Sequence, residues 1–183
     1  MQAQNLRANR LPHFDTLIIM GGPMGVYEGH PFLREEVEVV KRAVREGKKV
    51  LGVCLGGQVL SASLGGEVRK GTFGQEVGIG SVKLLPPLSQ VLEEEEVEVL
   101  HWHGDTFTLP QGASLLGYSP KYFQAFRVGR ALGLQFHLEV DAEMVGKWVE
   151  IYGGSKSLVE QVREREGEFR EAMAKILEWW INP

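Results

Sequence analysis

Two short apolar segments, separated by an amphipathic stretch, constrain the fold of this chain more than any other feature. Residues 16–20 (TLIIM) and 48–53 (KKVLGV) are apolar runs typical of strands buried on both faces. Between them, residues 31–45 carry apolar side chains at helical spacing, and Gly47 supplies a C-terminal cap. Short glycine-punctuated links between strand, helix and strand favour parallel pairing. The sequence therefore predicts an α/β fold.

The rest of the chain adds strands and helices to this unit. Residues 75–85 and 97–102 alternate in the manner of antiparallel strands, and three more short strands follow. These three are predicted at 113–118, 123–128 and 131–136. Two final helices are expected, one over 141–152 and one from Ser155 or Ser157 towards Trp180. We expect a mostly parallel central sheet with additional antiparallel strands.

The composition is that of a soluble globular protein. The chain has 183 residues, 43% hydrophobic and 24% charged, which fits a single domain spanning 1–183. A net charge of −4 gives no basic excess for binding nucleic acid or an anionic membrane, and no apolar run reaches the ~20 residues of a membrane span. One cysteine cannot form an intramolecular disulfide, which favours a reducing, cytoplasmic location. No cofactor is expected.

That cysteine, Cys54, stands where a strand is predicted to end and a short helix over 55–64 to begin. Lone cysteines are more often buried packing residues than nucleophiles. Here, however, Gly52 and Gly56 lie two residues before and after it, as in the strand–turn–helix elbow that presents catalytic nucleophiles. Only glycine leaves room on so sharp a turn. The beginning of a helix also favours the thiolate, which is the reactive form.

A histidine and a glutamate at the end of another apolar strand could activate this nucleophile. Residues two apart in an extended segment project to the same side, so Glu139 can lie beside His137 and fix its tautomer. The other ring nitrogen can then face Cys54. This is the arrangement of nucleophile, base and orienting carboxylate.

A glycine-rich turn, Gly21 to Gly25, follows the first predicted strand. Ligands bind at such turns, at the carboxyl ends of parallel strands. It lacks the lysine of a phosphate loop and the spacing of a dinucleotide fingerprint, which argues against nucleotide binding. The amide of Gly22 is placed to act as an oxyanion donor, and the amide of Leu55, at the start of its helix, is free to be another.

Five segments of the sequence resemble the class I, triad-type glutamine amidotransferases. In chain order they are IIMGGPMGVYE (18–28), GVCLGGQVLSASLGGEV (52–68), HWHGDTFTLP (101–110), FQAFRVG (123–129) and GLQFHLEV (133–140). The chain looks most like stand-alone bacterial members similar to the amidotransferase domain of GMP synthase.

This resemblance implies a flavodoxin-like three-layer sandwich and a thioester mechanism. Cys54 would attack the γ-carboxamide of glutamine, His137 would protonate the departing ammonia, and water would release glutamate. A synthetase partner would receive the ammonia. The implied site residues are a triad of Cys54, His137 and Glu139, an oxyanion hole of Gly22 and Leu55, and a substrate-binding set of Gln58, His103, Gly104 and Asp105.

The chain departs from the family pattern at two places. Leu138 replaces the proline common between the triad histidine and glutamate, which leaves the side-chain spacing unchanged. Only 20 residues precede Gly21, whereas the family's first strand, helix and second strand need about 40. Either the start of the chain is assigned too late, or the first β-α unit is missing and residues 1–10 form a remnant strand. An exposed edge strand would favour a homo-oligomer.

Other functions remain open at this level. The same triad would serve a γ-glutamyl peptidase acting on glutathione-like compounds, and the missing unit would fit a catalytically silent regulatory protein. Cys54 could also be a redox thiol. His101 and His103 form a His-x-His pair, but no third ligand stands at suitable spacing in the sequence, so no metal is expected.

Overall fold

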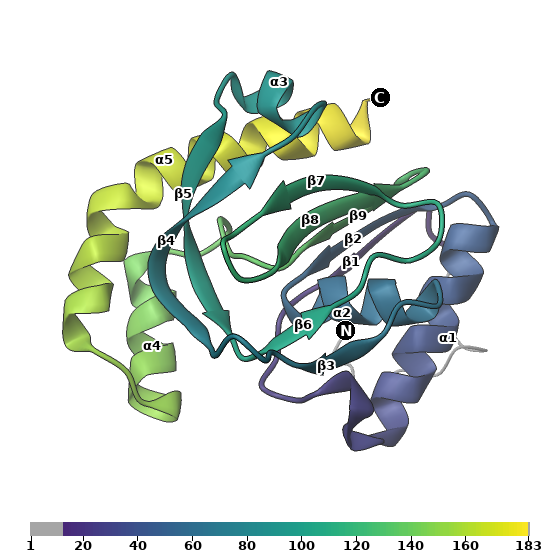
Figure 1. The fold of residues 1–183 in the computed structure, drawn as a ribbon, viewed down its shortest axis with the longest axis horizontal. Coiled ribbons are helices and arrows are strands. Elements are labelled where there is room, and N and C mark those ends of the chain that lie inside the picture. The colour runs from purple at the N-terminus through teal and green to yellow at the C-terminus, as the bar shows by residue number, and fades with distance from the viewer. Residues whose placement is uncertain (1–12, 183) are drawn as a thin grey trace.

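The computed structural model describes residues 13–182 (Figure 1). In chain order its elements are β1 (Thr16–Ile19), the 3-10 helix η3 (Val26–Glu28), α1 (Pro31–Arg45), β2 (Lys49–Val53), α2 (Leu55–Ser63), β3 (Val68–Lys70), β4 (Glu76–Leu84), α3 (Leu88–Leu92), β5 (Glu96–His103), β6 (Asp105–Phe107), β7 (Ser114–Tyr118), β8 (Phe123–Val128), β9 (Ala131–Leu134), α4 (Ala142–Tyr152) and α5 (Lys156–Ile181).

A curved sheet of seven strands forms the centre, in the order β1-β2-β9-β8-β7-β4-β5. β1 with β2 and β2 with β9 run parallel, whereas the other neighbouring pairs are antiparallel. The α/β prediction is confirmed, but the sheet is mixed rather than mostly parallel. Short links join β7 to β8 and β8 to β9, and such links permit only antiparallel pairing.

Helices cover both faces of this sheet and make the predicted three layers (Figure 1). α1 and α2 pack on one face, where Val50 of β2 joins their apolar side chains. The helices α3, α4 and α5 contribute to the core on the other face, which includes Leu51 of the same strand. Neighbouring residues of a strand point to opposite faces, so a continuous apolar run is what a central strand needs.

Most predicted boundaries are confirmed. α1 covers residues 31–45 and is followed by Gly47, whose φ of +70° is the left-handed conformation expected at a helix end. The Asp141 side chain caps α4 by accepting a hydrogen bond of 2.8 Å from the Met144 amide. Ser155 is the N-cap of α5. Helix α3 and the small antiparallel sheet of β3 with β6 were not predicted, because segments of three to five residues carry too little periodicity.

Strand β1 lies at an edge of the sheet. Within residues 13–182 it pairs with β2 alone, and Ile18 is 51% exposed. The predicted remnant strand at 1–10 lies outside the described residues. Among the described helices, none is long and apolar enough to cross a membrane.

The close approach of α2 to β1 gives a first prediction. A Cβ added at Gly56 would lie 2.1 Å from the Ile19 carbonyl oxygen, so the backbone itself must move. We expect Gly56→Ala to lower the free energy of unfolding by about 3 kcal/mol or more. Urea denaturation followed by circular dichroism measures this.

Gly167 in α5 is the matched control. No described atom lies within 4 Å of a Cβ added there. Because alanine favours a helix more than glycine does, Gly167→Ala should raise the free energy of unfolding by about 0.5–1 kcal/mol. A Gly56→Ala variant as stable as the parent would contradict the packing described here.

Candidate active site

Cys54 occupies a strained turn between β2 and α2. Its φ of 53° and ψ of −110° lie in a region that residues with a side chain rarely adopt. Two backbone hydrogen bonds hold the turn: the Cys54 amide donates to the Leu134 carbonyl at 2.8 Å, and its carbonyl accepts from the Gln58 amide at 3.1 Å. A Cβ at Gly52 would lie 2.2 Å from the Gly56 carbonyl oxygen, which is why glycine is needed there.

His137 follows β9 and is fixed by both its backbone and its side chain. Its amide and carbonyl bond to Leu100 of β5 at 2.9 and 3.1 Å. Its ring Nδ1 donates to Glu139 Oε1 at 2.6 Å, and the other Glu139 oxygen accepts from the Leu138 amide at 3.1 Å. With Nδ1 held in this way, Nε2 is the nitrogen left for another partner.

The glycine turn after β1 shows how closely the cysteine and the histidine approach. A Cβ placed on Gly21 would lie 3.3 Å from His137 Cε1 and 4.0 Å from Cys54 Sγ. One point beside the turn thus contacts both side chains. The structure therefore brings Cys54 together with the His137–Glu139 pair, which lies on a separate segment of the sequence.

Electrostatics favour a charged His137. Burial lowers the pKa of its imidazole, but hydrogen bonds with Cys54 and Glu139, together with their charges, outweigh burial and raise the pKa to about 10. An imidazolium therefore lies beside the sulfur at neutral pH.

These groups open into a pocket of about 660 Å³. Every residue singled out from the sequence lines it: Gly22, Cys54, Leu55, Gln58, His103, Gly104, Asp105, His137 and Glu139. Gly22 and Leu55 are neighbours, since a Cβ at Gly22 would lie 3.0 Å from Leu55 Cδ2.

The polar side chains of the pocket are held by one another. Gln58 is buried and donates to Gln135 Oε1 at 3.2 Å and to the Asp105 carbonyl at 3.5 Å. Asp105 Oδ1 accepts a hydrogen bond of 3.0 Å from the Tyr27 hydroxyl. Burial and the Asp105 carboxylate raise the pKa of Tyr27, which keeps this phenol a donor.

One side of the pocket was missed by the sequence reasoning. Met144, Trp148 and Tyr152 of α4 line it, and the Trp148 ring packs edge-on against the His137 ring with centroids 5.1 Å apart. Their spacing of four residues places them on one helix face, and this was the available signal.

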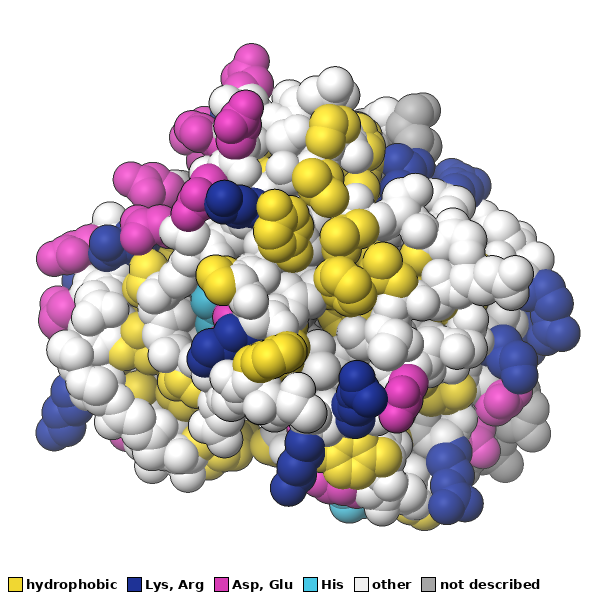
Figure 2. Space-filling view, in the orientation of Figure 1, with side chains coloured by type: hydrophobic (Ala, Val, Ile, Leu, Met, Phe, Trp, Pro, Cys, Tyr) yellow, Lys and Arg dark blue, Asp and Glu magenta, His cyan; other side chains and the backbone are white. Residues whose placement is uncertain are grey.

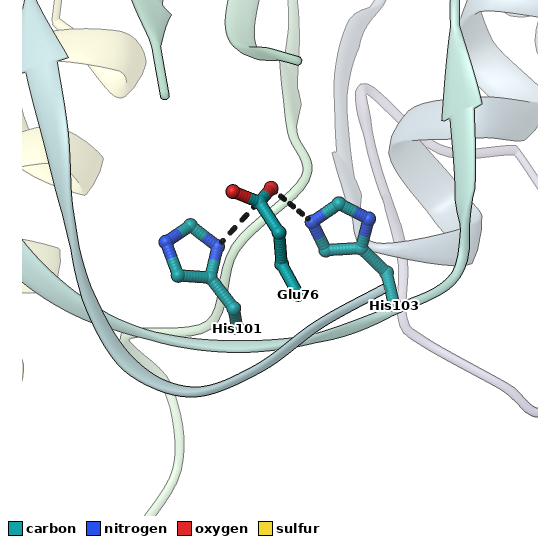
Figure 3. A group of neighbouring side chains, drawn as sticks. All are labelled: Glu76, His101 and His103. Carbon is teal, nitrogen blue, oxygen red and sulfur yellow. Dashed lines mark ion pairs between the residues drawn. The ribbon is translucent and has the colours of Figure 1, made fainter. Parts of the chain in front are cut away.

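A second polar cluster lies beside the pocket, on β4 and β5 (Figure 3). Glu76 Oε2 is 3.1 Å from His103 Nε2 and 4.0 Å from His101 Nδ1. The three ligand atoms lie within 4.8 Å of one another, close enough to hold a metal ion. The expectation that the histidine pair lacks a third ligand is therefore wrong, because strand pairing supplies Glu76 from another part of the chain.

Opposing effects set the charges of this cluster. Burial lowers the pKa of His101 to about 4 despite the nearby Glu76 carboxylate, so this ring is neutral at pH 7. Burial also acts to raise the pKa of Glu76, but contacts with His103 and Ser119 outweigh it and leave the pKa below its usual value. The cluster thus offers an anionic oxygen beside a neutral imidazole.

Comparisons with known proteins point to one family. The model of the class-I glutamine amidotransferase family matches residues 2–149. A glutamine amidotransferase from Thermotoga maritima is similar at 32% identity, with 93% of this chain and 79% of that chain covered and a TM-score of 0.86. One from Methylobacillus flagellatus is similar at 27% identity over 96% and 82%, with a TM-score of 0.85.

A Thermoplasma acidophilum protein, proposed to be one of the subunits of a GMP synthase, shares the fold at 22% identity over 93% and 82%, with a TM-score of 0.64. The search of curated proteins found no match. The family match over most of the sequence and the shared flavodoxin-like fold lead to one conclusion: this chain belongs to the class-I glutamine amidotransferases.

Proposed function

We propose that this protein hydrolyses the γ-carboxamide of glutamine through a thioester on Cys54 and releases glutamate and ammonia. The observation that carries the proposal is the meeting of Cys54, on its strained turn, with a His137 ring held by Glu139. Nucleophile, base and orienting carboxylate in this order are what acyl transfer from a carboxamide requires. The ammonia would pass to an acceptor on a synthetase partner.

In the first half of the reaction, Cys54 Sγ bonds to the γ-carbonyl carbon. The carbonyl oxygen gains negative charge, which the amides of Gly22 and Leu55 would stabilise, at about 3–4 kcal/mol for each well-placed donor. His137 then gives its proton to the amide nitrogen. The carbon–nitrogen bond breaks and ammonia leaves.

In the second half, water hydrolyses the thioester. His137, now neutral, takes a proton from the attacking water, and the new oxyanion is held by the same two amides. The carbon–sulfur bond breaks, glutamate forms, and the proton returns to the cysteine–histidine pair. Trp148, packed on His137, shields the ring from solvent and limits its rotation.

The amino-acid end of glutamine needs charged and polar partners, and these lie around the far part of the pocket. We assign the carboxylate of Asp105 to the substrate ammonium group, since both its oxygens lie near the glycine turn: Oδ1 contacts Tyr27 and Oδ2 would lie 3.2 Å from a Cβ at Gly25. Gln58, His103 and Gly104 would complete this part of the site.

The pocket also favours testing a second substrate class. Its 660 Å³ is in the range of pockets that hold ligands larger than one amino acid. γ-Glutamyl peptides would use the same thioester and release an amine in place of ammonia. Comparing kcat/KM for glutamine and for glutathione-like compounds separates the two, and a higher value for the peptides would replace the glutaminase proposal.

Loss of the sulfur is the first test of the function. We expect Cys54→Ala to lower glutamine hydrolysis at least about 10⁴-fold, because no covalent intermediate can form. Glutamate release measures this. A diazo-ketone analogue of glutamine should label the parent chain once, at Cys54, and glutamine should block the labelling, as read by mass spectrometry. Labelling elsewhere, or none, would identify a catalytically silent binding protein.

The carboxylate behind the histidine is the second test. Glu139→Gln keeps the shape but permits the wrong histidine tautomer, so kcat should fall about 100- to 10,000-fold with a small change in KM. Glu143→Gln is the control, because that exposed carboxylate only pairs with Lys147 on the surface of α4 at 2.6 Å. Equal activity of both variants would remove Glu139 from the mechanism.

The charge of His137 gives a third test. Its raised pKa depends first on Cys54, so Cys54→Ala should lower it. At pH 8 we expect the ¹⁵N shifts of this ring to be those of an imidazolium in the parent chain and of a neutral imidazole in the variant. Nuclear magnetic resonance of the histidine-labelled protein distinguishes the two. Identical ring shifts in both proteins would show that the sulfur does not set the charge of His137.

A further inference from the structure

The β4–β5 hairpin brings a carboxylate and two imidazoles together on one face. In the strand register, Glu76 stands directly opposite His103, and His101 stands opposite Gly78. Residues 101 and 103 project to the same side of β5. Because Gly78 has no side chain, His101 can lean towards Glu76, and Figure 3 shows both rings turned to the carboxylate.

The hydrogen bonds of His103 determine which nitrogen faces the carboxylate with a lone pair. His103 Nδ1 lies 2.9 Å from the Asp105 carbonyl oxygen, which can only accept, so Nδ1 carries the proton. In the neutral ring, Nε2 then presents its lone pair to Glu76 Oε2 at 3.1 Å. A histidine that ligates a metal is oriented in this way, with its other nitrogen donating to a backbone carbonyl.

Neither ring nitrogen that faces Glu76 is satisfied by the protein. Within the described residues, His101 Nδ1 and His103 Nε2 are buried and without a hydrogen-bond partner. Buried polar atoms are almost always paired, and three electron-rich atoms that converge without donors between them call for a cation.

The carboxylate itself is held from behind. Gln124 is fully buried and its side-chain amide donates to Glu76 Oε2 at 2.6 Å and to Ser119 Oγ at 3.2 Å. An outer hydrogen bond of this kind fixes the direction of a ligating carboxylate.

We propose that Glu76, His101 and His103 form a binding site for a divalent transition-metal ion, with Zn²⁺ as the best match to two imidazoles and one carboxylate. Ligand atoms about 2.0–2.2 Å from a tetrahedral zinc lie roughly 3.3–3.5 Å apart. The separations of 3.1 and 4.0 Å to the carboxylate oxygen bracket this value. Three protein ligands leave the fourth position for water.

An ion has a route to this position. The space-filling view shows histidine and acidic side chains at the bottom of a hollow beside β4 and β5 (Figure 2), and the Glu76 side chain keeps 10% of its exposure. A bound ion would tie β4 to the end of β5, from which the chain continues to Gly104 and Asp105 at the pocket. It would thus hold the segment to which we assign the amino-acid end of the substrate.

The test is zinc binding in a background that lacks the thiol. Cys54 and His137 could themselves bind zinc, so the Cys54→Ala chain, freed of metal by chelation, is titrated with zinc chloride by calorimetry. We expect one ion per chain. Absence of binding in this background would overturn the proposal, and because no turnover is measured, the result is independent of the glutaminase function.

Variants locate the ion. His101→Asn and Glu76→Gln, each in the Cys54→Ala background, should lower zinc affinity at least about 100-fold. His30→Asn is the matched control, because His30 also pairs with a single carboxylate, Glu28, at 3.0 Å, on the surface. Unchanged affinity in both site variants would contradict the assignment.

A measurement on the unmutated chain covers the case in which a variant fails to fold. X-ray absorption of the chain with one equivalent of zinc should show only nitrogen and oxygen neighbours at about 2.0–2.2 Å. A sulfur neighbour at about 2.3 Å would place the ion on Cys54 and overturn the proposal.

Discussion

The left-handed turn at Cys54 is the constraint on which the rest of the site depends. A residue with a side chain adopts this conformation only when its surroundings hold it there, and here the surroundings are backbone atoms at very short range. Gly52, Gly56 and Gly57 would each place a Cβ within 2.7 Å of a backbone atom. The absence of these side chains lets α2 sit directly against β1 and β9, and so fixes where the sulfur points.

The histidine reaches this sulfur because of the sheet order. β9 pairs with β2, so the residues that follow the two strands emerge at the same edge of the sheet, next to the glycine turn after β1. His137 then pairs with Leu100 of β5, which closes the curved sheet over the site. Burying a charged pair costs free energy unless each member is hydrogen-bonded. Glu139, held in turn by the Leu138 amide, meets that condition for the imidazolium.

The β4–β5 hairpin links the pocket to a second set of polar groups. His103 belongs to both, since it lines the pocket and also faces Glu76. The hairpin carries polar side chains on a face that is otherwise close to the apolar core around Leu100 and α5. Polar groups in such a position need partners, and the hydrogen bonds of Gln124 and Asp105 supply some of them while leaving the two ring nitrogens unpaired.

The sequence by itself determined the features that arise from local pattern. The bounds of α1, the cap at Asp141, the elbow around Cys54 and the pairing of His137 with Glu139 all follow from residues a few positions apart. It did not determine how far the sheet is antiparallel, that Trp148 packs on His137, or that Glu76 meets His101 and His103. Those features depend on strand order and register, which join residues tens of positions apart, and only the folded chain decides which distant partners share a face.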